Sequence, residues 1–254
     1  MRRYALRDDQ WERIKDLLPG RKDTVGATAQ DNRLFVEAVL YRYRTSVPWR
    51  DLPERFGDWK NIHRRHRRWA ENGVWEKIFK HLAQDADNEY AMIDSTIVRA
   101  HQHSAGARRD KKGIQNEAIG RSKGGLTTKI HAVCDALGNP TGFHLTPGQA
   151  HDLQGADVFL PEIKAQTLVA DKAYDADERV IEPLRKAGKT IVIPPKSNRQ
   201  NKRDYDEDLY KDRHLIENFF AKLKQYRALA TRYDKRAATF LSAVYMAAAI
   251  IWLN

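Results

Sequence analysis

One carboxylate in the last quarter of the chain stands among two cations and a phenol at fixed spacing. The run reads Tyr210-Lys-Asp-Arg-His-Leu-Ile-Glu217-Asn-Phe-Phe-Ala-Lys-Leu-Lys224. On a single helix, at about 100° per residue, Tyr210, Arg213 and Lys224 fall within roughly 40° of Glu217, so the four side chains form one polar stripe. A separate apolar stripe is formed by Leu209, Ile216, Phe220 and Leu223. The pattern predicts a helix that packs on a core and turns its polar face to a cleft, although an exposed helix with ordinary charge pairs has the same spacing.

Two upstream aspartates each stand in an apolar run that is typical of a strand. Asp94 follows Tyr90-Ala-Met-Ile93, and Asp171 follows Thr167-Leu-Val-Ala170. A carboxylate beside buried strands is costly unless it pairs with a cation or a metal, although either aspartate alone could simply cap a strand end or turn. Together with Glu217 they supply three hard oxygen ligands. Such a set is expected to hold two Mg²⁺ ions about 4 Å apart, which act on a phosphodiester.

The chain resembles a known group, the DDE transposases of bacterial insertion sequences, within the insertion-sequence-five family. That family's signature is Tyr, two residues, Arg, three residues, Glu, six residues, Lys, and the chain matches it in full at Tyr210, Arg213, Glu217 and Lys224. Other similar segments are 94–101, 120–131, 145–152, 170–175 and 232–235. The resemblance implies that Asp94, Asp171 and Glu217 are the catalytic acids of an α/β domain with a ribonuclease H-like mixed sheet.

The resemblance also implies the reaction. One metal ion, on Asp94 and Asp171, would activate water or a DNA 3′-hydroxyl, and a second, on Asp94 and Glu217, would stabilise the leaving oxygen. Mg²⁺ is the expected ion, and Mn²⁺ could replace it. The other signature residues would contact phosphates or a base near the scissile bond: Tyr210, Arg213 and Lys224. The expected protein is a transposase that binds the terminal inverted repeats of its element, cleaves DNA and transfers strands.

Two other functions fit the same residues. A metal-dependent nuclease would use the same three acids to cut DNA without joining it. A DNA-binding regulator derived from a transposase would keep the N-terminal region and lose catalysis, which the intact acids and signature argue against.

The composition of the chain agrees with a nucleic-acid partner. The 254 residues carry a formal net charge of +11 and a pI near 9.7, which favours a polyanion. The N-terminus has no apolar signal region, so double-stranded DNA, both element ends and target, is the expected partner, bound by a homodimer or larger assembly. The single cysteine, Cys134, excludes an intramolecular disulfide and is expected in the core. A cytoplasmic, nucleoid-associated protein is predicted.

Residues 1–85 are expected to form a helical DNA-binding domain, since they hold five of the six tryptophans and no alternating strand pattern. Helices are predicted over 8–18, 31–44 and 58–72. Residues 48–57 followed by 58–68 resemble a helix-turn-helix, with a short helix, a glycine turn and a basic helix. Its expected phosphate and base contacts are Lys60, Arg64, Arg67 and Arg68, while the alternative is a solvated face on a structural helix. His63 and His66 are expected to face solvent or phosphate.

Residues 89–254 are expected to form the catalytic domain, after an acidic linker at 84–89. Strands are predicted at 89–99, 126–134, 140–146, 167–171 and 190–193. Helices are predicted from about 151 and over 175–187, with Asp175 and Glu178 as a structural capping box. The uncharged segment 237–254 is predicted to be a buried helix docked along the catalytic domain rather than a membrane span.

Two basic loops have equally open interpretations. Residues 103–125 could clamp the DNA backbone or merely aid solubility through Arg108, Arg109, Lys111, Lys112, Arg121 and Lys123. The loop 196–203 has the same two interpretations. Four histidines in family-like segments are expected to be hydrogen-bonded structural residues: His101, His131, His144 and His151.

Overall fold

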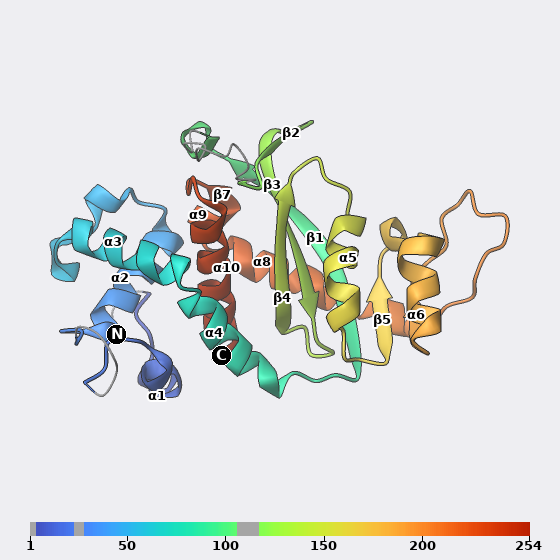
Figure 1. The fold of residues 1–254 in the computed structure, drawn as a ribbon, viewed down its shortest axis with the longest axis horizontal. Helices are drawn as coiled ribbons and strands as arrows, with labels where there is room; N and C mark the ends of the chain where they lie inside the picture. The colour runs from blue at the N-terminus through green and yellow to red at the C-terminus, as the bar shows by residue number, and fades with distance from the viewer. Residues whose placement is uncertain (1–3, 23–27, 106–116) are drawn as a thin grey trace. The chain divides into compact units, whose positions relative to one another are not determined.

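A computed structural model describes residues 4–22, 28–105 and 117–254 (Figure 1). The chain divides into two compact units. The first is made of Met1–Gln84, His101–Arg108 and Lys222–Asn254, and the second of Asp85–Ala100 and Arg109–Ala221. These units differ from the expected division into 1–85 and 89–254, because His101–Arg108 and the last 33 residues, 222–254, group with the N-terminal helices.

The first unit is helical. Its elements are α1 (Asp8–Ile14), α2 (Asn32–Thr45), α3 (Trp59–Glu71), α4 (Val74–Leu82), α9 (Arg227–Ala230), the short β7 (Thr231–Arg232) and α10 (Ala237–Trp252). Aspartates begin two of the predicted helices: the Asp31 carboxylate accepts the Leu34 N–H at 2.8 Å, and Asp58 accepts the Lys60 N–H at 2.9 Å. Helix α4 was not among the sequence-based predictions.

Helix α10 forms the centre of the first unit. It is apolar around its whole circumference and is buried from Ser242 to Ile250. A helix of this kind must be covered on all sides, and α10 packs on α3 and α4, where the Phe79 and Tyr245 rings lie 5.1 Å apart. The structure groups this helix with the N-terminal helices in the first unit; its docking along the catalytic domain stays a prediction. Among the described residues, no helix combines the length and apolar character needed to cross a bilayer.

The expected helix-turn-helix differs from the structure before its second helix. Two short 3₁₀ turns, Trp49–Asp51 and Glu54–Phe56, replace the first helix. Gly57 then takes a left-handed φ of 86°, a backbone conformation that would be strained for any residue with a side chain. Asp58 follows as the N-cap of α3. The basic helix is thus present, whereas two prolines, Pro48 and Pro53, each start a separate turn.

The second unit is built on a mixed sheet. Its strands are β1 (Tyr90–Ala100), β2 (Gly120–Ser122), β3 (Gly125–Cys134), β4 (Pro140–Pro147), β5 (Thr167–Ala170) and β6 (Thr190–Val192). Strand β1 pairs antiparallel with β3, which also pairs with β2 and β4. On its other side β1 pairs parallel with β5, and β5 with β6. All five predicted strands are present, and Cys134 is buried as predicted.

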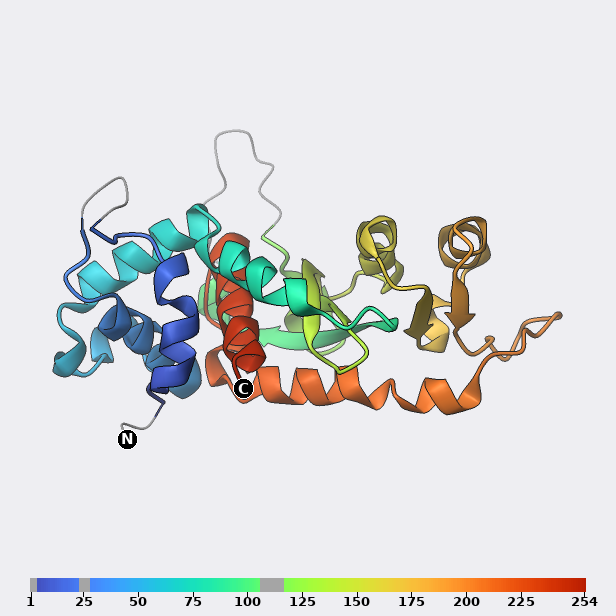
Figure 2. The ribbon, with the colours of Figure 1, turned by 90° about the horizontal axis from the view of Figure 1, so that it is seen from below.

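Helices cover both faces of this sheet (Figure 2). On one face lie α5 (Leu153–Phe159) and a π-helical turn, Asp177–Ile181, that continues into α6 (Glu182–Lys186). Between them and the strands is an apolar cluster that includes Ile93, Leu168 and Leu184.

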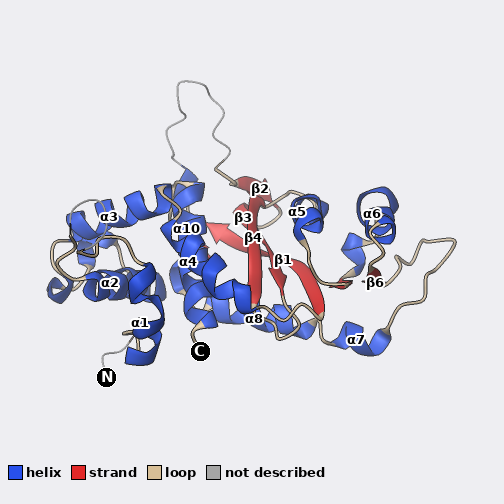
Figure 3. Ribbon diagram, turned by 60° about the horizontal axis from the view of Figure 1, so that its bottom comes forward, coloured by secondary structure: helices blue, strands red, loops and turns tan. Residues whose placement is uncertain are grey.

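The opposite face carries α8 (His214–Lys224), preceded by α7 (Glu207–Lys211) (Figure 3). The Phe143 and Phe219 rings meet there at 5.7 Å. The mixed α/β sheet expected from the sequence is confirmed.

Close packing between α5 and β3 generates a stability prediction. A Cβ added at Gly155 would collide with the buried His131 ring. We expect Gly155→Ala to destabilise the protein by about 1–3 kcal/mol through overpacking, although alanine is the better helix former by about 1 kcal/mol. Urea unfolding followed by circular dichroism measures the change. The control is Gly124→Ala, where the nearest atom, Ser122 Oγ, lies 3.7 Å away, and an equal loss there would contradict the packing argument.

Candidate active site

Two aspartates lie side by side at the centre of the sheet. Ile93 of β1 is in register with Ala170, the last residue of the parallel strand β5, so Asp94 and Asp171 each follow one residue later. Asp94 is within β1 rather than at its end, and its side chain is only 18% exposed. Asp171 leaves the sheet, and its carboxylate accepts the Ala173 N–H at 2.9 Å.

The position of Asp94 perturbs its titration. Burial raises the pKa of Asp94 to about 6, and the charges of Asp171 and Asp152 act in the same direction. The Ser95 N–H, 2.7 Å from Asp94 Oδ1, and the Arg213 guanidinium oppose that rise. A carboxylate this desolvated and this close to other acids favours a bound cation.

Arg213 supplies a cation in the free chain. Its Nη1 lies 2.8 Å from Asp94 Oδ2, and its Nη2 donates to Glu217 Oε1. The guanidinium therefore bridges the acid on β1 and the acid on α8. Neighbouring carboxylates outweigh the effect of burial and raise the pKa of Arg213, which keeps it charged.

The sequence pattern predicted that the four signature residues lie on one continuous helix, and this prediction is wrong. The helix is interrupted at Asp212 and Arg213, between α7 and α8. At this break the Tyr90 hydroxyl donates to Asp212 Oδ2 at 3.0 Å. Tyr210 lies on α7 and contacts the Tyr205 ring edge-on, whereas Lys224 is exposed at the end of α8.

The donor chemistry of this site fits a divalent cation. Carboxylate oxygens are the ligands that Mg²⁺ prefers, and a positive group already stands between Asp94 and Glu217. Within residues 4–22, 28–105 and 117–254, however, no three acidic, histidine or cysteine side chains gather closely enough to hold a metal. Glu217 meets Asp94 through Arg213, so assembly of all three acids around a metal requires that guanidinium to move.

A second, largely buried ion pair contacts β1 and was not among the site residues predicted from the sequence. The Lys129 Nζ lies 2.9 Å from Asp152 Oδ1, and the Ser95 hydroxyl donates to the same oxygen. Burial would raise the pKa of Asp152, but these two hydrogen bonds hold it below its ordinary value. The available signal was Lys129 itself, the one lysine or arginine in the predicted strand 126–134.

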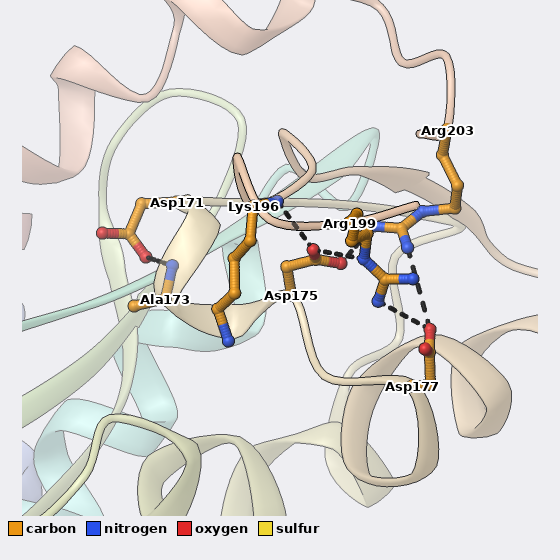
Figure 4. A network of polar contacts seen from close by, with 7 residues as sticks. All are labelled: Asp171, Ala173, Asp175, Asp177, Lys196, Arg199 and Arg203. Carbon is orange, nitrogen blue, oxygen red and sulfur yellow. Dashed lines mark hydrogen bonds and ion pairs between the residues drawn. The ribbon is translucent and has the colours of Figure 1, made fainter. Parts of the chain in front are cut away.

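The loop after β6 is fixed to the turn after β5 (Figure 4). The Asp175 side chain is fully buried and accepts from Arg203 at 2.6 Å, from Arg199 Nε and from the Lys196 N–H at 2.8 Å. Arg199 also pairs with Asp177 at 2.7 Å. These arginines are engaged within the protein, which disfavours the DNA-clamp interpretation of 196–203. Asp175 is structural as predicted, yet it does not cap the helix, because Ala176 is its N-cap.

The first unit presents the cations expected on α3. The side chains exposed along this helix include Lys60, Arg64, Arg67 and Arg68. His66 was expected to face solvent or phosphate, and this expectation is wrong. It is fully buried, lies 3.1 Å from the Tyr43 hydroxyl, and burial lowers its pKa to about 4. The reason is helical spacing, since His66 lies on the same face as Ile62 and Trp69. His63 is half-buried beside Trp49.

Only some of the cations expected to contact DNA from the loop 103–125 lie within the described residues. Arg121 and Lys123 are exposed on and beside β2. Four cations of the same loop lie outside the described residues: Arg108, Arg109, Lys111 and Lys112.

The four histidines expected to be structural make protein contacts. The His131 Nε2 lies 2.8 Å from Thr146 Oγ1, His151 accepts the Leu153 N–H at 3.2 Å, and His101 accepts the His103 N–H at 3.3 Å. The His144 ring lies 6.0 Å from that of His131.

Comparison with known proteins identifies the family. Residues 87–252 match the family described as "Transposase DDE domain". The chain belongs to the DDE transposase family. Residues 6–79 match a second family, "Putative transposase of IS4/5 family (DUF4096)". The resemblance to transposases of bacterial insertion sequences is confirmed.

Relatives of this DDE transposase come from bacteria. "Putative transposase for insertion sequence element IS6501" of Brucella ovis is 42% identical over 132 residues, which cover 51% of this chain and 100% of the relative. "Uncharacterized protein y4sN" of Sinorhizobium fredii is 54% identical over 109 residues, covering 43% and 87%.

One solved structure shares the fold. It is the piggyBac transposase synaptic complex with hairpin DNA, at 12% identity and a TM-score of 0.50 over 94% of this chain and 69% of that one. At this identity the likeness concerns the fold alone.

The Asp175 network generates a prediction for the pH dependence of stability. Against burial, its arginine partners lower the pKa of Asp175 from 3.8 to about 2. Because the folded pKa is depressed, the stabilisation is present above pH 4 and is lost as the pH falls towards 2. We expect Asp175→Asn to lower the free energy of unfolding by about 2 kcal/mol at pH 7. Below pH 4 this difference from the wild type should shrink progressively.

Urea unfolding of both proteins between pH 3 and pH 7 measures this convergence. Asp157→Asn is the matched control, since the ion pair of Asp157 with Arg179 is half-exposed and should be worth at most about 1 kcal/mol. A gap between wild type and Asp175→Asn that stays constant with pH would contradict the assignment.

Proposed function

We propose that the protein binds the terminal inverted repeats of its insertion sequence, cleaves the DNA there and transfers the freed strands to a target. The observation that supports this most is the placement of Asp94 within β1 and of Asp171 directly after the parallel strand β5, with Arg213 bridging Asp94 and Glu217. These are the three acids that the family resemblance assigns to catalysis.

The sheet supports a ribonuclease H-like core. Strand β1 stands between an antiparallel neighbour, β3, and a parallel one, β5, with helices on both faces. Asp94 lies within β1, and Asp171 follows the neighbouring parallel strand β5.

The acids would hold two divalent cations, one on Asp94 and Asp171 and one on Asp94 and Glu217. When bound, Mg²⁺ or Mn²⁺ would make the attacking hydroxyl more acidic and neutralise the leaving oxygen. The protein's own residues would bind and orient the DNA. Arg213 is suited to exchange its carboxylate partners for a phosphate, since guanidinium binds both in the same bidentate way. Tyr210 and Lys224 would contact flanking phosphates or a base.

The exposed cations would bring the DNA to this site. Lys60, Arg64, Arg67 and Arg68 on α3 would contact phosphates, and some would reach base edges. Arg121 and Lys123 offer a second set beside β2. Because an element has two ends, we expect the active assembly on DNA to be at least a homodimer.

Cleavage at the borders of the element tests the reaction. The protein is incubated with Mg²⁺ or Mn²⁺ and a plasmid that carries its gene and native flanking DNA, and new 3′ ends are mapped. We expect metal-dependent cuts at both borders of an inverted repeat and no cuts with Asp171→Asn or Glu217→Gln, because each variant lacks a carboxylate ligand. DNA binding by these variants, measured by gel shift, should be little changed.

Two outcomes would contradict the proposal in different ways. Cuts scattered without relation to the borders would favour a nuclease. Specific binding without cleavage by the wild-type protein would favour a regulator.

The role of α3 is tested by salt dependence. Each phosphate contact contributes about 0.9 to the slope of log K against log salt concentration. We expect the double variant Arg64→Gln and Arg68→Gln to weaken binding to duplex DNA and to reduce this slope by about 2. The control removes two exposed cations elsewhere, Arg13→Gln and Arg179→Gln, and has the same net charge. An equal reduction in both double variants would overturn the assignment of α3.

A further inference from the structure

A cavity of about 790 Å³ lies in the first unit, against the C-terminal half of α3. Its walls come from α3, from the start of α4 and from the segment between α1 and α2. Three of the side chains that line it are cations: Arg65, Arg68 and Lys77. Among the residues that the structure describes, no aspartate or glutamate lines it. The cavity therefore gathers positive charge without an acid in its wall to balance it.

Arg65 is held in a fixed orientation at the wall of this cavity. Its guanidinium carbon lies 4.2 Å from the centre of the Phe35 ring and 5.0 Å from that of Trp69. Its Nη2 donates to Asn32 Oδ1. The Asn32 amide is itself fixed, because its Nδ2 donates to the Pro19 carbonyl at 3.2 Å. A guanidinium held in this way is preorganised for a ligand, since little of its freedom remains to be lost on binding.

The protein leaves the charge of Arg65 without a counter-ion. None of the three cations of the cavity forms an ion pair with a described acid. Burial lowers the pKa of Arg65, and the charge of Arg68 acts in the same direction, while that of Asp31 opposes this change without reversing it. An anion in the cavity would relieve both the burial of the charge and the repulsion from Arg68.

The lining of the cavity favours a phosphate over a base. Arginine and lysine side chains only donate hydrogen bonds, which suits the acceptor oxygens of a phosphate. The rings of Phe35 and Trp69 are each 5% exposed and already contact Arg65, so they offer little surface on which a base could stack. Arg68 also follows Arg64 by four residues on the exposed side of α3. A DNA backbone along that side would therefore bring a phosphate to the cavity.

We propose that the cavity is a phosphate-binding site for the backbone of duplex DNA, with Arg65 as its fixed anchor and Arg68 and Lys77 as its exposed cations. The inference rests on the proposed function, because it assumes that DNA lies along α3. It adds two contacts to that function, Arg65 and Lys77, the second of which comes from α4. A phosphate contact carries no information about bases, so its loss weakens binding to all sequences about equally.

Salt-dependent binding to a DNA duplex of random sequence tests the site. Fluorescence anisotropy gives the affinities of wild-type protein, Lys77→Gln and the control Lys80→Gln at several salt concentrations. We expect Lys77→Gln to reduce the slope of log K against log salt concentration by about 0.9, the contribution of one phosphate contact. Lys80→Gln changes the net charge equally and removes an exposed cation of the same helix, whose partner is Glu76 at 2.8 Å. It should leave the slope unchanged.

Two substitutions of Arg65 separate binding from packing. Arg65→Gln should reduce the slope by about 0.9, whereas Arg65→Lys, which keeps the charge, should retain the wild-type slope. A purely structural role would lower the melting temperature of both variants and leave both slopes unchanged. That result would overturn Arg65 as the anchor of the site.

The other outcomes separate this inference from the proposed function. Equal slopes for Lys77→Gln and Lys80→Gln would overturn the phosphate site, while α3 would keep its assignment if the Arg64→Gln and Arg68→Gln double variant still reduces the slope. Inorganic phosphate at constant ionic strength could instead raise the melting temperature of the wild type but not of Lys77→Gln. With equal DNA slopes, that result would assign the cavity to a free anion and overturn its role with DNA. Wild-type protein that binds no duplex would overturn the inference and the proposed function together.

Discussion

The parallel pairing of β1 with β5 imposes the main electrostatic constraint on the second unit. It places Asp94 of β1 and Asp171, the residue after β5, one position beyond the paired residues Ile93 and Ala170, where burial and mutual repulsion disfavour the charged state of Asp94. A folded chain can tolerate this arrangement only if cations or hydrogen-bond donors are fixed nearby. Much of the polar structure around the sheet provides such groups.

The protein meets this constraint with separate polar contacts. Arg213 neutralises Asp94 directly, and the Ser95 N–H donates to its other oxygen. Lys129 neutralises Asp152, so that acid adds little uncompensated charge beside the pair. Asp175 takes two arginines of its own and fixes the turn that begins at Asp171. Asp94, Asp152 and Asp175 each have a cation partner, because an unpaired buried charge is far more costly than a paired one.

Local patterns in the sequence were sufficient to predict the strands and the acids on them. Apolar runs ending at Asp94 and Asp171 have the length and composition of buried strands, and the observed strands agree. Family resemblance supplied the connection to Glu217. Capping aspartates likewise predicted where α2 and α3 begin.

Contacts between distant residues account for the differences. The break before α8 lies at Asp212, which pairs with Tyr90 122 positions away, and no periodicity within 210–224 could reveal that contact. The arginines of the loop after β6 looked free for DNA because their partner, Asp175, lies 24 or more positions earlier. Helix α10 was correctly expected to be buried, but an apolar helix does not specify its partner. Arg213 lies at the break between α7 and α8, and from there its guanidinium bridges a strand acid and a helix acid. The feature least visible in the sequence is therefore the one that keeps the most exposed acid of the three, Glu217, connected to the sheet.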